Sequence, residues 1–430
     1  MATMAKSGAA PVPAKGFPKP LLIVLGVLTL AGIGCWIFQL ANGLGVTGMS
    51  NTTSWGVYIT LFMFFVGLSA GGLIVASSAH VFNIESFKKV ALPAVIASTV
   101  CICLAGLFIF LDLGGIQRVW RMFTGPNFVS PLMWDMGVIT LYLVINILDI
   151  VWIVKGDEAK VHKLSFVALP TAIMVHSVTA WIFGLQIGRT WHTAIMAPIF
   201  VASACDSGLA LLLLGLVVLE ARGIFHTGAE LFGKLAKLLA VFIAVDAYFI
   251  ACELLTMGYP GAGEASALAV MTTGASAPFF WFEIIGGLLV PFLILVLAKS
   301  RERRGVVVGA SVLVVLGVLC KRIWLLFTAF VAPYVNGSPV VPDYYLAPDA
   351  LGFGQLGAFY VPTAIELVIV IGVLSLGTLA FMVLSEKLCA VQAEVPEAAP
   401  AAGKDAVAVA SRATTAPASE LDDEAMPSGA

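Results

Sequence analysis

The chain has 430 residues, of which 60% are hydrophobic and only 11% are charged. Soluble domains carry about 25% charged residues, so this composition excludes an ordinary soluble protein and indicates a polytopic membrane protein. The formal net charge of −2 says nothing by itself about partners. Membrane lipid is the expected surrounding, and no nucleic-acid partner is expected.

Ten apolar runs are long enough to cross a bilayer as helices, each of which needs about 20 residues. The first run follows Lys15 and Lys19, but it is too long for a signal peptide and lacks a cleavage motif of small residues, so we expect it to be retained. The predicted fold class is therefore an all-α membrane protein with ten transmembrane helices. The predicted spans are residues 21–41, 55–81, 90–112, 132–154, 164–187, 193–220, 236–257, 278–298, 306–331 and 361–385.

Basic residues predict how these spans are oriented. All but five of the 23 Lys and Arg residues lie in the tails, or in loops and span ends on the side of the N-terminus. The exceptions are Arg118, Arg121 and Arg189 on the opposite side, and Lys321 and Arg322 within a span. Because cytoplasmic loops carry an excess of Lys and Arg, we expect both termini to be cytoplasmic.

The tails and the long loops differ in composition from the spans. The C-terminal end is rich in Ala, Pro, Glu and Ser and the N-terminal end in Ala and Pro, and both are predicted to be disordered cytoplasmic tails. The longest loops, near 113–131, 258–277 and 332–360, face outward and either dock a partner or are simply long. The predicted segments are the N-terminal tail (1–20), the first flanking helix and outer loop (21–54), a first four-helix bundle (55–188), a second four-helix bundle (189–331), an outer loop with the last flanking helix (332–388) and the C-terminal tail (389–430).

Two sequence features recur in the same order. A Trp followed by a Gly 17 residues later occurs at 55–72 and again at 191–208, and a Pro-x-x-Trp motif opens a span at 131–134 and at 278–281. Four spans separate the copies, so both halves would have the same topology, a parallel repeat about an axis along the membrane normal. Chance alignment of Trp and Gly in apolar helices is the alternative. At the position near His176, the second copy has Lys321 and Arg322.

His176 and Asp206 are the strongest candidates for chemistry. Counted from the ends of adjacent spans, both lie roughly 20 Å from the outer boundary, so we expect the two side chains to meet. An ionisable group in a span is costly and indicates function. A neutral imidazole beside a carboxylate could accept the protons that a quinol releases on oxidation. The alternative is a His–Asp pair that only clamps two helices.

Further buried charges lie in the spans. Asp246 and Glu253 are seven residues apart, hence on one helix face, and Glu283 lies in the eighth span. Lys321 and Arg322 provide the positive charge inside the bundle. These five residues are candidates for a proton path, with ion pairs that stabilise the second bundle as the competing view. Asp112, Asp135 and Glu366 are other acids within or at the ends of spans.

Several cofactors are excluded by the distribution of His and Cys. A haem in a helix bundle needs facing His ligands, and only His176 of the five His residues lies deep in a span. The seven Cys are scattered and none forms a CxxC motif, so neither zinc nor an iron–sulfur cluster is expected in this chain. Motifs of soluble enzymatic sites are also missing from the sequence.

Three motifs together resemble the NrfD/PsrC-type membrane subunits that interact with quinone. They are S-W-G-V-Y-I-T through S-A-G-G (54–72), L-D-L-G-G-I-Q-R-V-W (111–120) followed by S-P-x-x-W, and H-S-V-T-A-W-I-F (176–183). The likeness covers roughly 20–385, and ten spans resemble the longer branch of the family, which includes membrane subunits of alternative complex III and of the hydrogenase-2 type. The family's Asp-x-Gly-x-Pro-x-Arg pattern lacks its Pro here, which leaves the local turn unpredicted.

The resemblance implies a subunit of a respiratory complex in the bacterial inner membrane, without a redox cofactor of its own. It would bind a quinone, menaquinone by expectation, near the outer side through His176 and Asp206, with Asp112 and Arg118 as further contacts. Electrons would pass to or from a four-cluster, ferredoxin-like iron–sulfur subunit on the outer face. Through that subunit they would reach a molybdopterin, hydrogenase or multihaem cytochrome subunit.

Two other functions stay open. A secondary transporter could use the same parallel repeat and buried charges, but it would need unwound helices in mid-membrane, and the predicted spans are continuous. A purely structural membrane anchor is the third possibility. It predicts that no quinone is purified with the protein and that replacing the buried pair has no effect.

Overall fold

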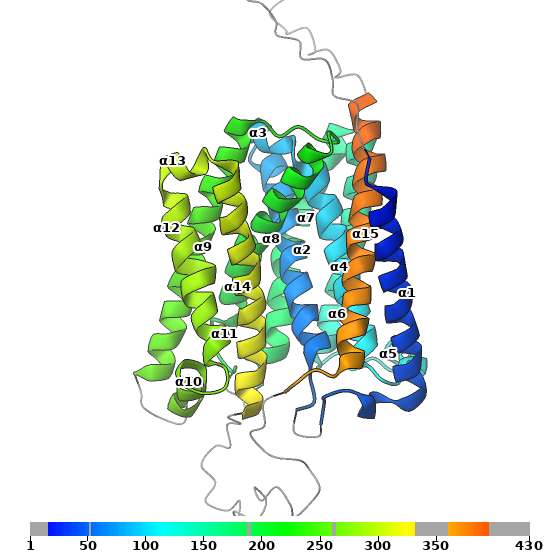
Figure 1. Ribbon diagram of the computed structural model, residues 1–430, viewed down its shortest axis with the longest axis vertical. Helices are drawn as coiled ribbons and strands as arrows, with labels where there is room; N and C mark the ends of the chain where they lie inside the picture. Colours follow the sequence, from blue (N-terminus) through cyan, green and yellow to red (C-terminus); the bar gives the residue numbers. More distant parts are fainter. Residues whose placement is uncertain (1–15, 51–52, 187–190, 260–263, 332–359, 395–430) are drawn as a thin grey trace, which may run out of the picture. The chain divides into compact units, whose positions relative to one another are not determined.

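The computed structural model describes residues 16–50, 53–186, 191–259, 264–331 and 360–394. Among them every regular element is helical (Figure 1), and ten spans are long and apolar enough to cross a membrane, which confirms the predicted fold class. They belong to one compact unit that ends at Gln392. The spans are α1 (Lys19–Asn42), α2 (Val57–Val81), α4 (Ala91–Asp112), α6 (Pro131–Val154), α7 (Glu158–Gly184), α8 (Met196–Ala221), α9 (Ala229–Gly258), a composite span (Ala277–Val296), α14 (Arg304–Val331) and α15 (Ala364–Glu394).

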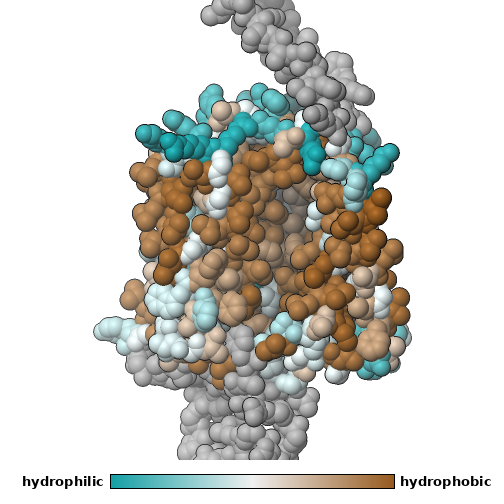
Figure 2. Space-filling view, in the orientation of Figure 1, coloured by the Kyte–Doolittle hydropathy of each residue, from teal (hydrophilic) through white to brown (hydrophobic). Residues whose placement is uncertain are grey.

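Short helices mark the two ends of the bundle (Figure 1). At one end lie α3 (Glu85–Lys88) and α13 (Ala298–Arg301); at the other lie α5 (Arg121–Thr124) and α10 (Glu264–Thr272). We call these the α3/α13 end and the α5/α10 end. Figure 2 shows an apolar band between them and the most hydrophilic residues at the α3/α13 end, as expected for a protein embedded in a bilayer.

Two spans begin earlier than the apolar runs predict, because capping and charge pairs extend them into polar sequence. α7 begins at Glu158, where the carboxylate of Asp157 accepts the backbone N–H of Lys160 at 3.2 Å. A hydrogen bond from the Lys160 side chain holds the pKa of Asp157 below its ordinary value. α9 begins at Ala229, and its first turn carries a 2.7 Å ion pair between Glu230 and Lys234.

The composite span is not the continuous α-helix that the sequence predicts. It consists of α11 (Ala277–Trp281), a π-helical segment η3 (Phe282–Leu289) and α12 (Val290–Val296). At its centre Gly287 packs on Gly317 of α14, so close that a Cβ on Gly287 would lie 2.6 Å from the Gly317 Cα. π-Helical turns are rare and occur frequently at functional sites; this one contains the buried Glu283.

Two contacts join positions that the predicted repeat treats as equivalent or nearly so. Trp55 and Trp191 stack on each other with ring centroids 6.1 Å apart. Between α2 and α8, a Cβ on Gly71 would lie 2.8 Å from the Gly208 Cα, and Gly71 adjoins the predicted equivalent of Gly208. Elements related by a two-fold axis meet themselves at that axis. If the repeat is real, its axis therefore passes between α2 and α8; the repeat itself stays a prediction.

The Pro-x-x-Trp copies make matching contacts. The indole N–H of Trp134 donates to the Phe128 carbonyl at 2.7 Å, and that of Trp281 donates to the Thr272 carbonyl at 2.9 Å. In each case the partner lies in the segment that precedes the span. The bundle boundaries at 55–188 and 189–331 remain predictions.

The first and last spans pack against each other through small residues. A Cβ on Gly32 of α1 would lie 2.7 Å from the Gly372 Cα of α15. α15 opens with a capping box, in which Glu366 accepts the backbone N–H of Thr363 at 2.8 Å. Glu366 also accepts the N–H of Gly48 at 2.8 Å and the hydroxyl of Tyr360, whose pKa burial raises above its ordinary value. Glu366 is thus a structural clamp.

Candidate functional site

His176, Asp206 and Arg322 lie at one depth on three neighbouring helices. His176 is eight residues before the end of α7, Asp206 ten residues after the start of α8, and Arg322 nine residues before the end of α14. At 1.5 Å per residue these positions are about 12, 15 and 14 Å from the α5/α10 end. All three side chains are 0% exposed. His176 and Asp206 lie at similar depths, as predicted, but nearer to this end of their helices than the roughly 20 Å expected.

The predicted contact between His176 and Asp206 is wrong. The Nε2 atom of His176 lies 3.2 Å from the Nη2 atom of Arg322, which also donates to the Ser203 hydroxyl at 2.7 Å. Both carboxylate oxygens of Asp206 lack a hydrogen-bond partner among the described residues. The depth of a residue does not determine the direction of its side chain around the helix axis. Ser203 and Asp206 are three residues apart on α8, so their side chains point about 60° away from each other.

The hydrogen bond to Arg322 determines the tautomer of His176. A guanidinium can only donate, so Nε2 accepts and the neutral ring carries its proton on Nδ1. Within the described part of the chain this Nδ1 forms no hydrogen bond of standard geometry, although the imidazole interacts with the Phe200 backbone, and Nε and Nη1 of Arg322 have no partner. The guanidinium carbon lies 3.9 Å from the centroid of the Phe200 ring, which stabilises the buried cation. Gly67 of α2 leaves room for the imidazole, since a Cβ there would lie 3.3 Å from Cε1.

Five buried polar atoms at the three-helix site formed by His176, Asp206 and Arg322 are therefore unpartnered within the described ranges. Each such group costs about 1–3 kcal/mol, and more when it is charged. Three of the atoms are nitrogens of His176 and Arg322 and two are oxygens of Asp206, so the site offers both donors and acceptors. None of the best-formed cavities among the described residues is lined by these three side chains.

Lys321 forms the centre of an adjacent charged cluster with Asp246 and Glu283. Its Nζ lies 2.9 Å from Oδ1 and 3.0 Å from Oδ2 of Asp246, and 3.4 Å from Oε1 of Glu283. Trp324 donates its indole N–H to the other oxygen of Glu283. The structure thus unites three of the five residues predicted as a proton path, in the ion-paired form that was the competing view. Arg322 belongs instead to the three-helix site.

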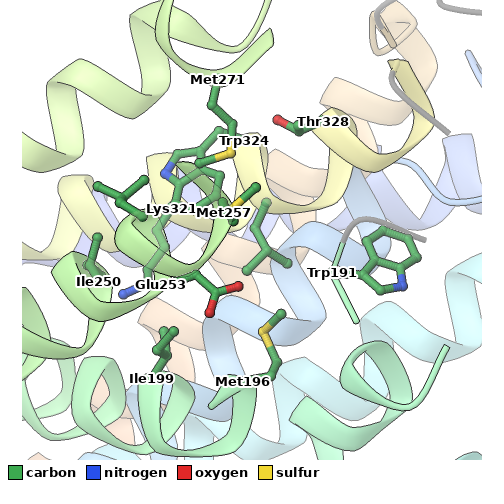
Figure 3. A pocket seen from close by; sticks show the side chains of 12 residues that line it. Trp191, Met196, Ile199, Ile250, Glu253, Met257, Met271, Lys321, Trp324 and Thr328 are labelled. Carbon is green, nitrogen blue, oxygen red and sulfur yellow. The ribbon is translucent and has the colours of Figure 1, made fainter. Parts of the chain in front are cut away.

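Glu253 lies between this charged cluster and the α5/α10 end. Its Oε2 accepts the Thr193 hydroxyl at 2.9 Å. Glu253 and Lys321 line one cavity of about 40 Å³ (Figure 3), enough for roughly two or three water molecules. The apolar remainder of the lining includes Trp191 and Met257. Water in this cavity would connect the ion-paired lysine with Glu253.

A larger cavity, of about 360 Å³, lies elsewhere in the bundle. It is almost wholly apolar and is enclosed by α2, α4, α8 and α15, with Phe65, Leu104, Leu212 and Phe381 among its lining residues. Close packing of Gly71 against Gly208 joins α2 and α8 beside it. The residues described around this cavity offer no charged group to a ligand.

Asp112 and Arg118 do not join the three-helix site. Asp112 ends α4, and its buried Oδ1 is unpartnered among the described residues, near Tyr58 and Glu366. Arg118 is exposed on the 3₁₀ turn η2 (Ile116–Arg118). Both belong to the described ranges, and there neither forms a hydrogen bond or ion pair with His176 or Asp206. Their predicted contact with quinone therefore finds no support in the contacts of these residues.

Two features of the site are not predicted by the sequence. Arg322 is expected to serve a proton path rather than to bind His176, although the repeat alignment places it near the position equivalent to His176. Residues at equivalent positions of a two-fold repeat approach each other when both lie close to the repeat axis. Ser203 and Phe200, which hold Arg322, carry no sequence signal of their own. In the described part of the chain, no three His, Cys, Asp or Glu side chains are grouped as metal ligands.

Comparison with known proteins places this arrangement in a family. The family model described as "Polysulphide reductase, NrfD" matches residues 45–333. A putative dimethyl sulfoxide reductase membrane subunit of Halobacterium salinarum is 35% identical, over 84% of this chain and 88% of its own length.

Two further relatives cover most of their own length. The Hdr-like menaquinol oxidoreductase integral membrane subunit of Archaeoglobus fulgidus is 29% identical, over 84% of this chain and 91% of its own. One chain of the polysulfide reductase of Wolinella succinogenes is 24% identical, over 64% and 94%. With ten apolar spans and a family match over most of its length, the chain belongs to the NrfD family of membrane subunits.

Proposed function

We propose that this chain is the quinone-reactive membrane subunit of a multi-subunit respiratory oxidoreductase, and that the quinone head group binds at the three-helix site. The five unpartnered polar atoms of His176, Asp206 and Arg322 carry this proposal, because buried polar groups without partners are rare and call for a ligand or water. Relatives named as menaquinol oxidoreductase and menaquinone reductase subunits favour menaquinone.

The donors and acceptors suit both forms of the substrate. The Nδ1–H of His176 and the free N–H groups of Arg322 would donate to quinone carbonyl oxygens, and the carboxylate of Asp206 would accept a quinol hydroxyl. Oxidation of a quinol releases two electrons and two protons. His176 is a poor base while Arg322 occupies its Nε2, because a second positive charge would form beside the first. Asp206 is therefore the residue that takes both protons in turn, passing the first to the charged cluster before it accepts the second.

Electrons would leave or arrive through an iron–sulfur subunit at the α5/α10 end. The segment between α4 and α6 presents Trp120, Phe123 and Phe128 there, each more than half exposed, beside the exposed Arg118. Aromatic and Arg side chains are enriched at protein interfaces. The molybdopterin, hydrogenase or cytochrome subunit would lie beyond this partner. The basic residues at the α3/α13 end favour the cytoplasm on that side, with the protein in a bacterial inner membrane.

The charged cluster and the small cavity give the site a proton route toward the α5/α10 end. The Lys321 ammonium would release a proton through cavity water to Glu253, and a proton from Asp206 would then pass by way of the nearby Asp246 to restore the ammonium. Ion-paired groups that can exchange protons with water are suited to such a relay.

The test uses the intact complex, purified through a tag on this chain, with quinone content and quinol-to-dye turnover as readouts. His176→Gln and Asp206→Asn should each lose bound quinone and most of the turnover while the complex still assembles. Ser177→Ala, a neighbouring hydroxyl bonded only to its own helix, is the matched control and should behave as wild type. Retention of quinone and turnover in both variants would contradict the proposal, and failure of both to assemble would favour a helix clamp.

A further inference from the structure

Helix α6 directs polar residues inward and apolar residues outward. Four of its five buried residues are polar, namely Asp135, Tyr142, Asn146 and Asp149, and each is at most 2% exposed. They follow one another at intervals of seven, four and three residues, which places them on one helix face. We call them the polar row.

The centre of the polar row is a continuous hydrogen-bonded network. The Tyr142 hydroxyl lies 2.7 Å from the Ser98 hydroxyl of α4 and donates to the Ser69 carbonyl of α2 at 2.8 Å. Ser98 also donates to the side-chain oxygen of Asn146 at 2.7 Å. Hydroxyl groups both donate and accept hydrogen bonds, so such a network can pass a proton along by exchanging bonds.

The two ends of the polar row are carboxyl groups. Asp135 lies toward the α5/α10 end and accepts the Thr179 hydroxyl at 2.6 Å; Thr179 is three residues from His176 on α7. Asp149 lies five residues before the other end of α6, about 8 Å from it along the helix axis. Its Oδ1 is buried and has no hydrogen-bond partner among the described residues.

A purely structural role explains the centre of the row but not its end. Polar side chains between membrane helices are common and join the helices by hydrogen bonds. Asp149 forms neither a hydrogen bond nor an ion pair within the described part of the chain, so it joins α6 to nothing there. A buried acid that contributes no bond is costly, and a carboxyl close to one aqueous face is suited to exchange protons with it.

We propose that the polar row conducts protons between the aqueous phase at the α3/α13 end and the three-helix site. Each step transfers a proton from one oxygen to the next, with one O–H bond broken and one formed, and involves no electrons. Asp149 exchanges protons with water, the hydroxyls of Ser98 and Tyr142 relay them while Asn146 orients Ser98, and Asp135 with Thr179 leads to α7 beside His176. The interval of seven residues between Tyr142 and Asp135 spans about 10.5 Å, so the route needs water between these two side chains. The end point of this route rests on the proposed function; its beginning at Asp149 does not.

The experiment uses the intact complex in liposomes of known orientation, with quinol in the bilayer and an impermeant dye as electron acceptor. A pH indicator confined to the compartment at the α3/α13 end records protons exchanged per electron. In wild type we expect part of the protons of quinol turnover to appear there. Asp149→Asn and Tyr142→Phe should each slow this exchange at least tenfold while bound quinone stays at the wild-type level. Thr140→Ala on the outward face of α6 should change nothing.

Unchanged proton exchange in Asp149→Asn, with quinone bound and turnover intact, would overturn the inference. Absence of quinone from the wild-type complex would overturn the proposed function instead. Should the variants fail to assemble, infrared difference spectra of the wild-type complex decide. A protonated-carboxyl band that responds to quinone reduction and changes frequency in the conservative Asp149→Glu complex supports the row, and a band that this substitution leaves unchanged overturns it.

Discussion

The two halves of the bundle bury polar groups in different ways. In the second half, Lys321 holds Asp246 and Glu283 in a fully buried charged cluster, and the adjacent cavity lies toward the α5/α10 end. In the first half, the equivalent interior holds the polar row, whose central network is uncharged and whose acid without a described partner lies toward the α3/α13 end. The halves meet where His176 contacts Arg322.

A low-dielectric interior places different requirements on buried charged groups and on buried neutral polar groups. Lys321, Asp246 and Glu283 are kept deep in the bundle as a paired set, because an uncompensated charge there costs several kcal/mol. Hydroxyl and amide groups need only hydrogen-bond partners, which Ser98 and Tyr142 give each other. The second half therefore depends on charge balance for its stability, and the first half on hydrogen bonds.

Lys321→Met should cause the largest loss, because it leaves Asp246 and Glu283 without their cation. Removing one partner of a buried ion pair costs about 3–5 kcal/mol, which thermal unfolding of the purified complex would measure. The charge-matched triple variant Lys321→Met, Asp246→Asn, Glu283→Gln should recover most of this stability. A single variant as stable as wild type would show that the second half does not depend on charge balance.

Arg322→Gln should lower quinol turnover by about two orders of magnitude, the usual effect of removing a fixed hydrogen-bond donor from a reacting oxygen. Initial rates at saturating quinol measure it. The Arg322→Lys variant keeps the charge but not the forked donors, so its rate should fall between the two. Full activity in Arg322→Gln would break the assignment of Arg322 to the three-helix site.

Tyr142→Phe should cost less stability than Lys321→Met, because it removes hydrogen bonds but leaves no charge unpaired. A buried hydrogen bond contributes about 1 kcal/mol, and an orphaned partner adds about 1–3 kcal/mol. Unfolding midpoints of the two variants, measured side by side, give the contrast. Equal losses of stability in the two variants would contradict the view that charge balance stabilises the second half and hydrogen bonds the first.

Trp134→Phe and Trp281→Phe should each produce the smallest effect, a loss of about 1 kcal/mol for one hydrogen bond. If the two Trp residues are equivalent in the repeat, their losses should agree within error in the same unfolding assay. A clear loss in one variant and none in the other would contradict the equivalence.

Much of the fold could be predicted because span length and apolar composition determine which segments cross a bilayer. The depth of His176 and Asp206 follows from counting residues along their helices. Rotation about the helix axis does not, and it decides that Ser203 rather than Asp206 approaches the partner of His176. The π-helical turn at Glu283 depends on packing of Gly287 against Gly317, which is a tertiary effect.

The capping box at Glu366 and the polar row of α6 both have recognisable spacings in the sequence, but neither is apparent when each residue is considered alone. Thr363-Ala-Ile-Glu366 has the spacing of a capping box, so the clamp role of Glu366 is available from the pattern. The spacing of Asp135, Tyr142, Asn146 and Asp149 marks one helix face, but among these the sequence prediction includes only Asp135. Both features become visible when buried acids are considered together with the polar residues of the same helix face.

Photolabelling with an azido-quinone tests the central claim most directly. After illumination of the intact complex, mass spectrometry of its peptides locates the attached head group. Binding at the three-helix site predicts label on α7, α8 and α14 near His176, Phe200 and Arg322, and less label in Arg322→Gln. Label confined to the apolar cavity between α2, α4, α8 and α15, unaffected by that substitution, would contradict it.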